Sequence, residues 1–139
     1  MLEKKYRYSA LILVWMLSTI AYGDINVKKG MWEISNHIEV SGLPIKIPDT
    51  KISQCIDAQT IIPKADKKIN KYCKIIEQTI VGNVVSWKMQ CTNKMQSHGS
   101  ITYHGKTFDG IVTTSTKVPH IGSMTMTNHI TGRRTGECK

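Results

Sequence analysis

CKIIEQTIVGNVVSWKMQC, residues 73–91, is the stretch that decides the fold class of this chain. Two runs rich in β-branched residues, 74–81 and 84–91, flank Gly82 and Asn83. Both of these residue types tolerate the positive φ that a two-residue hairpin turn requires. In that register Ile80 faces Val85 and Ile76 faces Met89, with Trp87 between them on the same side. The stretch therefore predicts an antiparallel hairpin.

The alternation of polar and apolar residues that is typical of half-buried strands recurs on both sides of this hairpin. From Trp32 to Val40 the even positions are apolar except for Asn36, whereas the odd positions are polar. A second turn at Gly105 and Lys106 would place Tyr103 opposite Phe108 and Ile101 opposite Gly110. Further strands are expected at 51–56, 100–104, 107–117 and 124–131.

Residues 57–72 interrupt this period of two. Pro63 suits the first position of a helix, and the lysines that follow fall on one helical side, which predicts a short basic helix over 63–71. The expected fold is all-β with this one helix: a single curved antiparallel meander sheet, shaped like a half-open barrel. A two-sheet sandwich is the alternative, and the continuous hairpin connections disfavour it.

The first 23 residues have the pattern of an export signal. Three basic residues precede an apolar run from Ala10 to Tyr22, and Ala21-Tyr22-Gly23 offers small residues for cleavage. The run is well short of the ~20 residues that span a bilayer as a helix. We therefore expect a signal peptide at 1–23, a single disulfide-bonded β-rich domain at 24–139, and a periplasmic or secreted location without a transmembrane segment.

Four cysteines in an exported chain indicate disulfides, and four cysteines permit three pairings. We favour Cys73–Cys91, because the hairpin brings both close together, with Cys55–Cys138 as the second bond. The spacing contains no C-x-x-C motif, which excludes a zinc ribbon and a thioredoxin-type redox pair.

The order and spacing of several short motifs resemble the small exported bacterial proteins grouped as domain of unknown function 3617. The resemblance covers residues 30–138 and implies a signal peptide, a secreted or periplasmic β-rich domain and paired cysteines. It implies no activity, and no catalytic or ligand residues carry over from the family. The motifs are Gly30-Met31-Trp32-Glu33, the cysteines around the Gly82-Asn83 hairpin, Tyr103-His104-Gly105, Phe108-Asp109-Gly110, Met124-Thr125-Met126 and the ending Gly132-Arg133-Arg134-Thr135-Gly136-Glu137-Cys138.

The chain carries 19 Lys+Arg against 10 Asp+Glu, which favours anionic partners. Peripheral contact with anionic surfaces is therefore expected, whereas the exported location disfavours nucleic acid. Arg133 and Arg134 are a candidate anion-binding pair, since guanidinium groups grip phosphate or carboxylate in forked hydrogen bonds. The alternative is that they pair with Glu33, Glu39 or Glu137 and orient the tail.

No catalytic motif and no metal-ligand spacing is present, so we expect no enzyme, no cofactor and no metal site. A curved sheet with one apolar face offers a concave surface instead. We expect this surface to bind a small apolar or amphiphilic ligand or an envelope protein. The alternative is a structural or stress-related interaction protein that uses its basic surface on anionic envelope components. The residues expected to line the concave face are Trp32, Ile34, Trp87, Met89, Tyr103 and Phe108.

Overall fold

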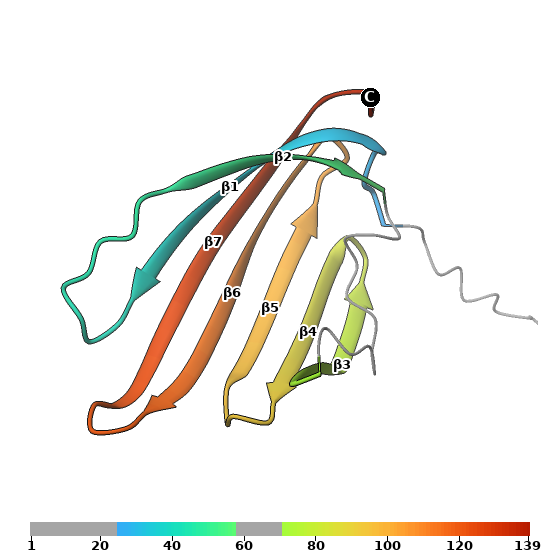
Figure 1. Ribbon diagram of the computed structural model, residues 1–139. Coiled ribbons are helices and arrows are strands. Elements are labelled where there is room, and N and C mark those ends of the chain that lie inside the picture. Colours follow the sequence, from blue (N-terminus) through green and yellow to red (C-terminus); the bar gives the residue numbers. More distant parts are fainter. Residues whose placement is uncertain (1–24, 58–70) are drawn as a thin grey trace, which may run out of the picture.

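The computed structural model describes residues 25–57 and 71–139, and in this part the chain is entirely β (Figure 1). Seven strands form one antiparallel sheet in the order β2-β1-β7-β6-β5-β4-β3. Their bounds are β1 Gly30–Val40, β2 Thr50–Ile56, β3 Cys73–Val81, β4 Val84–Cys91, β5 Gln96–Tyr103, β6 Thr107–Val118 and β7 Gly122–Gly136. The expected single antiparallel sheet is thus confirmed. The expected signal peptide and, apart from Lys71, the expected helix over 63–71 lie outside the described residues.

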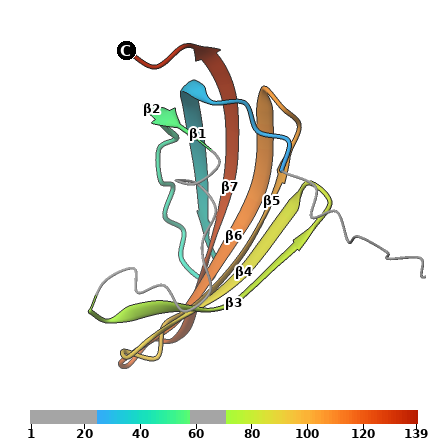
Figure 2. The same ribbon diagram turned by 90° about the vertical axis from the view of Figure 1, so that its right-hand side faces the viewer.

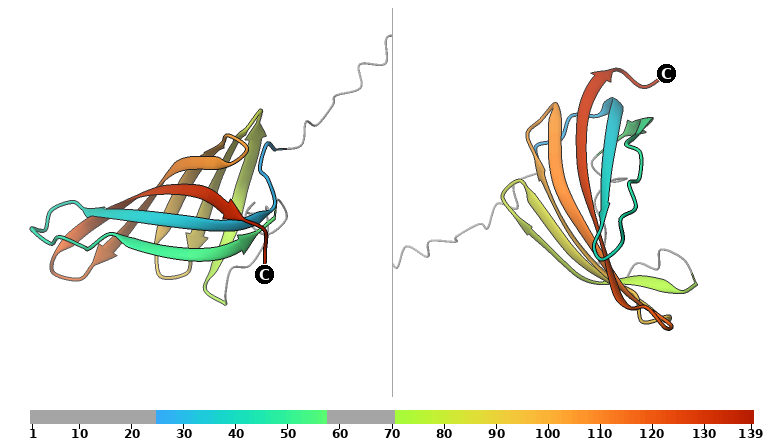
Figure 3. Two further views of the ribbon diagram at one scale, coloured as in Figure 1. Left: turned by 90° about the horizontal axis from the view of Figure 1, so that it is seen from above. Right: turned by 90° about the vertical axis from the view of Figure 1, so that its left-hand side faces the viewer.

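Strands β3 to β7 follow one another as the predicted meander, but the first hairpin does not extend it at the β3 side. Instead β1 pairs with β7, the last strand of the chain. Strands β2 and β3, which are consecutive in sequence, therefore form the two opposite edges of the sheet. Figures 2 and 3 show that the sheet is curved along its whole width and is not closed.

The hydrophobic core lies on the concave face of this sheet. Ile56 on the edge strand β2 and Val85 on β4 belong to one buried cluster, although four strands separate them in the sheet order. Side chains of strands so far apart can meet only when the sheet bends toward that face. The centre of the cluster is aromatic: the ring centroids of Trp32 and Phe108 are 5.4 Å apart, and those of Tyr103 and Phe108 are 5.8 Å apart.

The N-terminal residues of the described part close one end of the sheet. The backbone N–H of Lys28 donates to the carbonyl of Gly105 (2.9 Å), and the N–H of Gly105 donates to the carbonyl of Asn26 (2.7 Å). These bonds hold Ile25 in the core, where only 9% of its surface is exposed. We call residues 25–29 the strap; it covers the end where Tyr103 and Phe108 lie.

The hairpin register differs from the prediction in one place. The expected pairs Ile80–Val85 and Tyr103–Phe108 are present, and Ile101 lies opposite Gly110 as predicted. The prediction that Ile76 faces Met89 was wrong, because Ile75 takes that position. A β-bulge adds one residue to β3 between Ile75 and Glu77, and an added residue shifts all subsequent pairs by one.

The two disulfides are those favoured from the sequence. The bulge brings Cys73 directly opposite Cys91, and their Cα atoms are 4.1 Å apart. Cys55 on β2 is joined to Cys138, which follows β7, with Cα atoms 5.4 Å apart. Since β1 lies between β2 and β7, the second bond links the strands on either side of β1.

Candidate functional site

The concave face is divided into a filled end and a less covered end. Near the strap, the side chains of Trp32, Tyr103 and Phe108 are buried, with exposed fractions of 0%, 1% and 6%. Further along the same face most large apolar residues are only half-buried, although Ile75 on the edge strand β3 is buried with 2% exposed. Both halves belong to one surface, because strand residues two positions apart point to the same side. The half-buried residues are Ile34, Ile38, Val40, Trp87, Met89, Val112, Val118, Met124, Met126 and Ile130.

The six residues predicted to line the concave face are accordingly split between these two ends. Trp32, Tyr103 and Phe108 form packed core near the strap. Ile34 and Trp87 pack against that core but stay half-buried, and Met89 is half-buried further along β4. The half-buried end is therefore the part of the surface that a ligand could contact.

The register aligns a row of residues across the half-buried end. Trp87, Gly99 and Val112 are consecutive partners on β4, β5 and β6, and the row continues through Asn128 on β7 to Ile38 on β1. Gly99 has no side chain, and the indole ring of Trp87 lies over it. Trp87 is thereby laid along the sheet rather than upright on it.

Two asparagines are the polar exception on this apolar surface. The side-chain amide of Asn128 donates a hydrogen bond to Oδ1 of Asn36, with a distance of 3.0 Å. The remaining polar atom, Oδ1 of Asn128, is buried and has no hydrogen-bond partner in the protein. A buried acceptor without a donor costs free energy, which a hydroxyl or amide of a bound molecule would recover. The atom has almost no accessible surface, so such a group reaches it only when the side chains that cover it move.

Sequence reasoning did not single out Asn128 as a site residue, although a signal was present. Asn36 interrupts the apolar alternation of β1 at a core-facing position, and Asn128 does the same between Met126 and Ile130 on β7. Polar residues at core-facing positions on two strands are the pattern to look for. The polar pattern does not show that β1 and β7 are neighbours, because their pairing joins residues far apart in the sequence.

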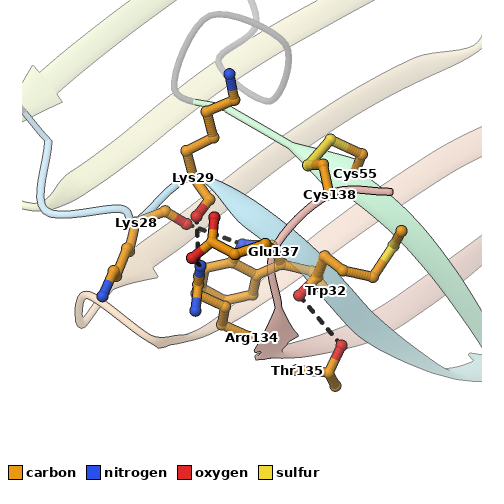
Figure 4. Close-up of polar contacts among 9 residues, drawn as sticks. Lys28, Lys29, Trp32, Cys55, Arg134, Thr135, Glu137 and Cys138 are labelled. Carbon is orange, nitrogen blue, oxygen red and sulfur yellow. Dashed lines mark hydrogen bonds and ion pairs between the residues drawn. A yellow bond between two sulfur atoms is a disulfide. The ribbon is translucent and has the colours of Figure 1, made fainter.

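The candidate anion-binding arginines are each paired within the protein. Nε of Arg133 donates to Glu33 on β1 with a distance of 3.1 Å. Arg134 lies opposite Trp32, donates through Nε to the carbonyl of Lys29 (2.8 Å) and pairs with Glu137 (Figure 4). Consecutive strand residues point to opposite faces, so the structure does not bring the two guanidinium groups together. These contacts match the alternative reading, in which the arginines orient the tail.

Two ion pairs shift pKa values on the convex face. The hydrogen bond and charge of Arg133 lower the pKa of Glu33 from its ordinary value. The hydrogen bond to Asp49, 2.6 Å from Nδ1 of His37, raises the pKa of His37. His129 lies beside His37 with ring centroids 6.2 Å apart. Among residues 25–57 and 71–139 no group of three or more His, Cys, Asp or Glu has the arrangement of a metal site.

Comparisons with known proteins place the chain in one family. Residues 27–138 match the family model described as "Protein of unknown function (DUF3617)", which confirms the resemblance inferred from the motifs. Neither the curated proteins nor the solved structures gave a match. Within the described residues, no helix has the length and apolar character needed to cross a membrane.

Proposed function

We propose that this chain, which belongs to the DUF3617 family of proteins of unknown function, is an exported, non-enzymatic envelope protein that binds a small amphiphile. In this proposal the curved sheet acts as a half-open barrel. The apolar part of the ligand lies on the half-buried end of the concave face. Because membership of the family brings no activity with it, the proposal depends on the geometry of that face.

The observation that carries the proposal is the unpartnered Oδ1 of Asn128 within an apolar surface. Binding sites for small molecules combine mostly apolar walls with a few placed polar groups that fix orientation. Here the walls are half-buried side chains such as Ile38, Val112 and Met126, and the placed group is the amide pair of Asn36 and Asn128. An apolar chain that carries one hydrogen-bond donor would satisfy both features. Each methylene group that it buries contributes about 0.8 kcal/mol.

The expected signal peptide and the disulfides support an exported location. The expected signal peptide at 1–23 would export the chain, and disulfides such as Cys55–Cys138 persist in oxidising compartments. We therefore place the protein in the periplasm or outside the cell.

A charge placed on one face or the other of a single strand tests the location of the site. Val112 lies on the concave face, whereas its neighbour Ile111 lies on the convex face with 48% of its surface exposed. Val112→Lys should abolish binding of an apolar fluorescent dye such as phenylnaphthylamine, and Ile111→Lys should leave binding unchanged. Equal dye binding by both variants would exclude the concave face.

A second substitution tests the polar contact without adding charge. The protein should bind decanol more tightly than the methyl ether of decanol, because only the alcohol can donate to Asn128. A hydrogen bond of about 1 kcal/mol corresponds to a preference of roughly fivefold. Asn128→Leu should remove this preference while retaining dye binding. If the wild-type protein binds alcohol and ether equally, Asn128 does not contact the ligand.

A further inference from the structure

We propose that the end of the sheet opposite the strap docks on a bilayer surface rich in acidic phospholipids. We call this end the rim; it consists of residues 71–74, 90–95 and 117–123, at the bottom of Figure 1. Two shallow hollows of about 460 and 500 Å³ lie along it, and both are lined by Lys94. The three segments therefore form one continuous surface. This docking does not depend on ligand binding by the concave face.

The rim carries positive charge that no carboxylate of the described residues neutralises. Its three segments contain Lys71, Lys74, Lys94, Lys117 and His120 but no Asp or Glu. All four lysines are exposed, and none forms an ion pair with a carboxylate of the described residues.

The opposite end of the sheet provides the contrast. There both arginines are paired with carboxylates, Arg133 with Glu33 and Arg134 with Glu137, whereas the lysines of that end form no ion pair with the described residues. His104 lies 2.8 Å from Asp109 at the same end. The rim thus differs from the strap end in that its segments hold positive charge and no carboxylate, and this is where an anionic surface would be attracted.

Two large apolar side chains project among the rim lysines. Ile121, at the tip of the β6–β7 hairpin, is 64% exposed, and Tyr72, before β3, is 55% exposed. Nζ of Lys71 lies over the Tyr72 ring, 4.7 Å from its centroid. Lysines beside an exposed aliphatic and an exposed tyrosine form the combination that binds headgroups and enters the interfacial layer. A small dissolved anion could bind to the lysines, but contact with Ile121 would not stabilise that complex.

The backbone conformation at the rim also supports the proposal. In the described part, the residues other than glycine with positive φ are Lys94 (64°) and His120 (68°), and both lie in rim turns. A side chain in this conformation is strained, and glycine or asparagine would relieve the strain. Strained residues persist where the surrounding structure or a function maintains them. Here the strained positions hold two cationic or titratable side chains at the tips of the rim.

The charge dependence can be measured by flotation with vesicles. Each lysine near an acidic membrane contributes about 1 kcal/mol, so losing one should weaken binding about fivefold. The rim variant carries Lys71→Gln, Lys74→Gln, Lys94→Gln and Lys117→Gln together and should lose binding by several hundredfold. The matched control carries Lys28→Gln, Lys29→Gln, Lys106→Gln and Lys139→Gln, which removes the same charge from the strap end.

The expected result is flotation of the purified wild-type protein and of the control variant with phosphatidylglycerol vesicles. Neither should float with phosphatidylcholine vesicles, and the rim variant should float with neither. Ile121→Trp should bind phosphatidylglycerol vesicles, with a blue shift of its emission and quenching by brominated lipid.

Several results would overturn the proposal. One is that the wild-type protein does not bind acidic vesicles, or that it floats equally with neutral ones. Another is an equal loss of binding in the rim variant and the control, which would indicate an effect of net charge alone. A third is binding of Ile121→Trp without a spectral shift, which would indicate that charges adsorb the protein and no apolar side chain enters the lipid.

Discussion

The aromatic ring of Phe108 lies over Gly132, its direct partner on the neighbouring strand β7. The same relationship occurs twice more: Trp87 lies over Gly99 and Ile101 over Gly110. In each pair a large side chain of one strand leans over the glycine of the next strand in sequence. Side chains that lie along the sheet occupy less height above it, and this allows the concave face to bend inward around its aromatic centre. Glycine at a close approach within a strand has this role elsewhere.

A methyl group on Gly132 should therefore destabilise the protein. The added Cβ would overlap the Phe108 ring, and overpacking of a core typically costs about 1–3 kcal/mol. Gly136 on the same strand is the control, because a Cβ there would meet no atom within 4 Å. Urea unfolding should give a clear loss of stability for Gly132→Ala and little change for Gly136→Ala. Similar midpoints for both variants would contradict the proposed role of the close approach.

Replacing Lys94 by glycine should stabilise the protein while removing a positive charge. A residue with a side chain at φ 64° is strained, and Lys94→Gly should relieve up to about 1 kcal/mol, less the added entropy of the unfolded chain. Lys94→Gln keeps the strain and removes the same charge, so its stability should stay near that of the wild type. The midpoint of thermal unfolding measures both. A lower midpoint for Lys94→Gly than for Lys94→Gln would show that the backbone there is not strained.

Protonated His37 should stabilise the contact between β1 and Asp49, which directly precedes β2. The hydrogen bond to Asp49 raises the pKa of His37 above its ordinary value of 6.5, with a smaller contribution from Glu39. The stabilisation is fully present below pH 6.5 and is lost as the pH rises through the higher pKa of the folded protein. Titration of the imidazole by NMR should show the raised pKa in the wild type and a lower one in Asp49→Asn. An unchanged pKa in that variant would exclude the contact.

Burial of Tyr103 should make the protein sensitive to alkali. Desolvation raises the pKa of Tyr103 from 10.0 to about 12, because the phenolate would be formed inside the aromatic core. A raised pKa means that stability is complete below pH 10 and is lost as the pH rises toward 12. Tyr103→Phe should therefore unfold with less dependence on pH in this range, as followed by circular dichroism. Ionisation of all tyrosines near pH 10 in the folded protein would contradict the burial effect.

Local patterns in the sequence were sufficient to predict most strands. The alternation in β1 and the turn residues at Gly82 and Gly105 act over a few positions, and both turn glycines have the positive φ that was expected, 59° and 85°. The facing of Tyr103 and Phe108 follows from the length of the second turn alone. Local chemistry determines these features, so a single sequence can reveal them.

Long-range features could not be predicted in the same way. The pairing of β1 with β7 is supported by contacts between residues about a hundred positions apart, such as Glu33 with Arg133. The bulge at Ile76 could be predicted only from the direct pairing of Cys73 with Cys91, and no local pattern in the sequence indicates that pairing. The site was partly predicted: the concave apolar face was expected, but the neighbouring positions of Asn36 and Asn128 depend on the same long-range pairing.

The bond between Cys55 and Cys138 turns most of the molecule into a covalent ring. Strands β3 to β7 all lie within this ring, whereas β1, the connection 41–49 and residues 50–54 of β2 lie on the N-terminal side of Cys55. A protease that cuts any of the four turns from Gly82 to Gly122 therefore leaves the polypeptide in one piece. Of the turns between described strands, only the connection between Val40 and Thr50 would release a fragment when cut. Proteolysis should thus leave the chain covalently intact unless the cut falls on the N-terminal side of Cys55.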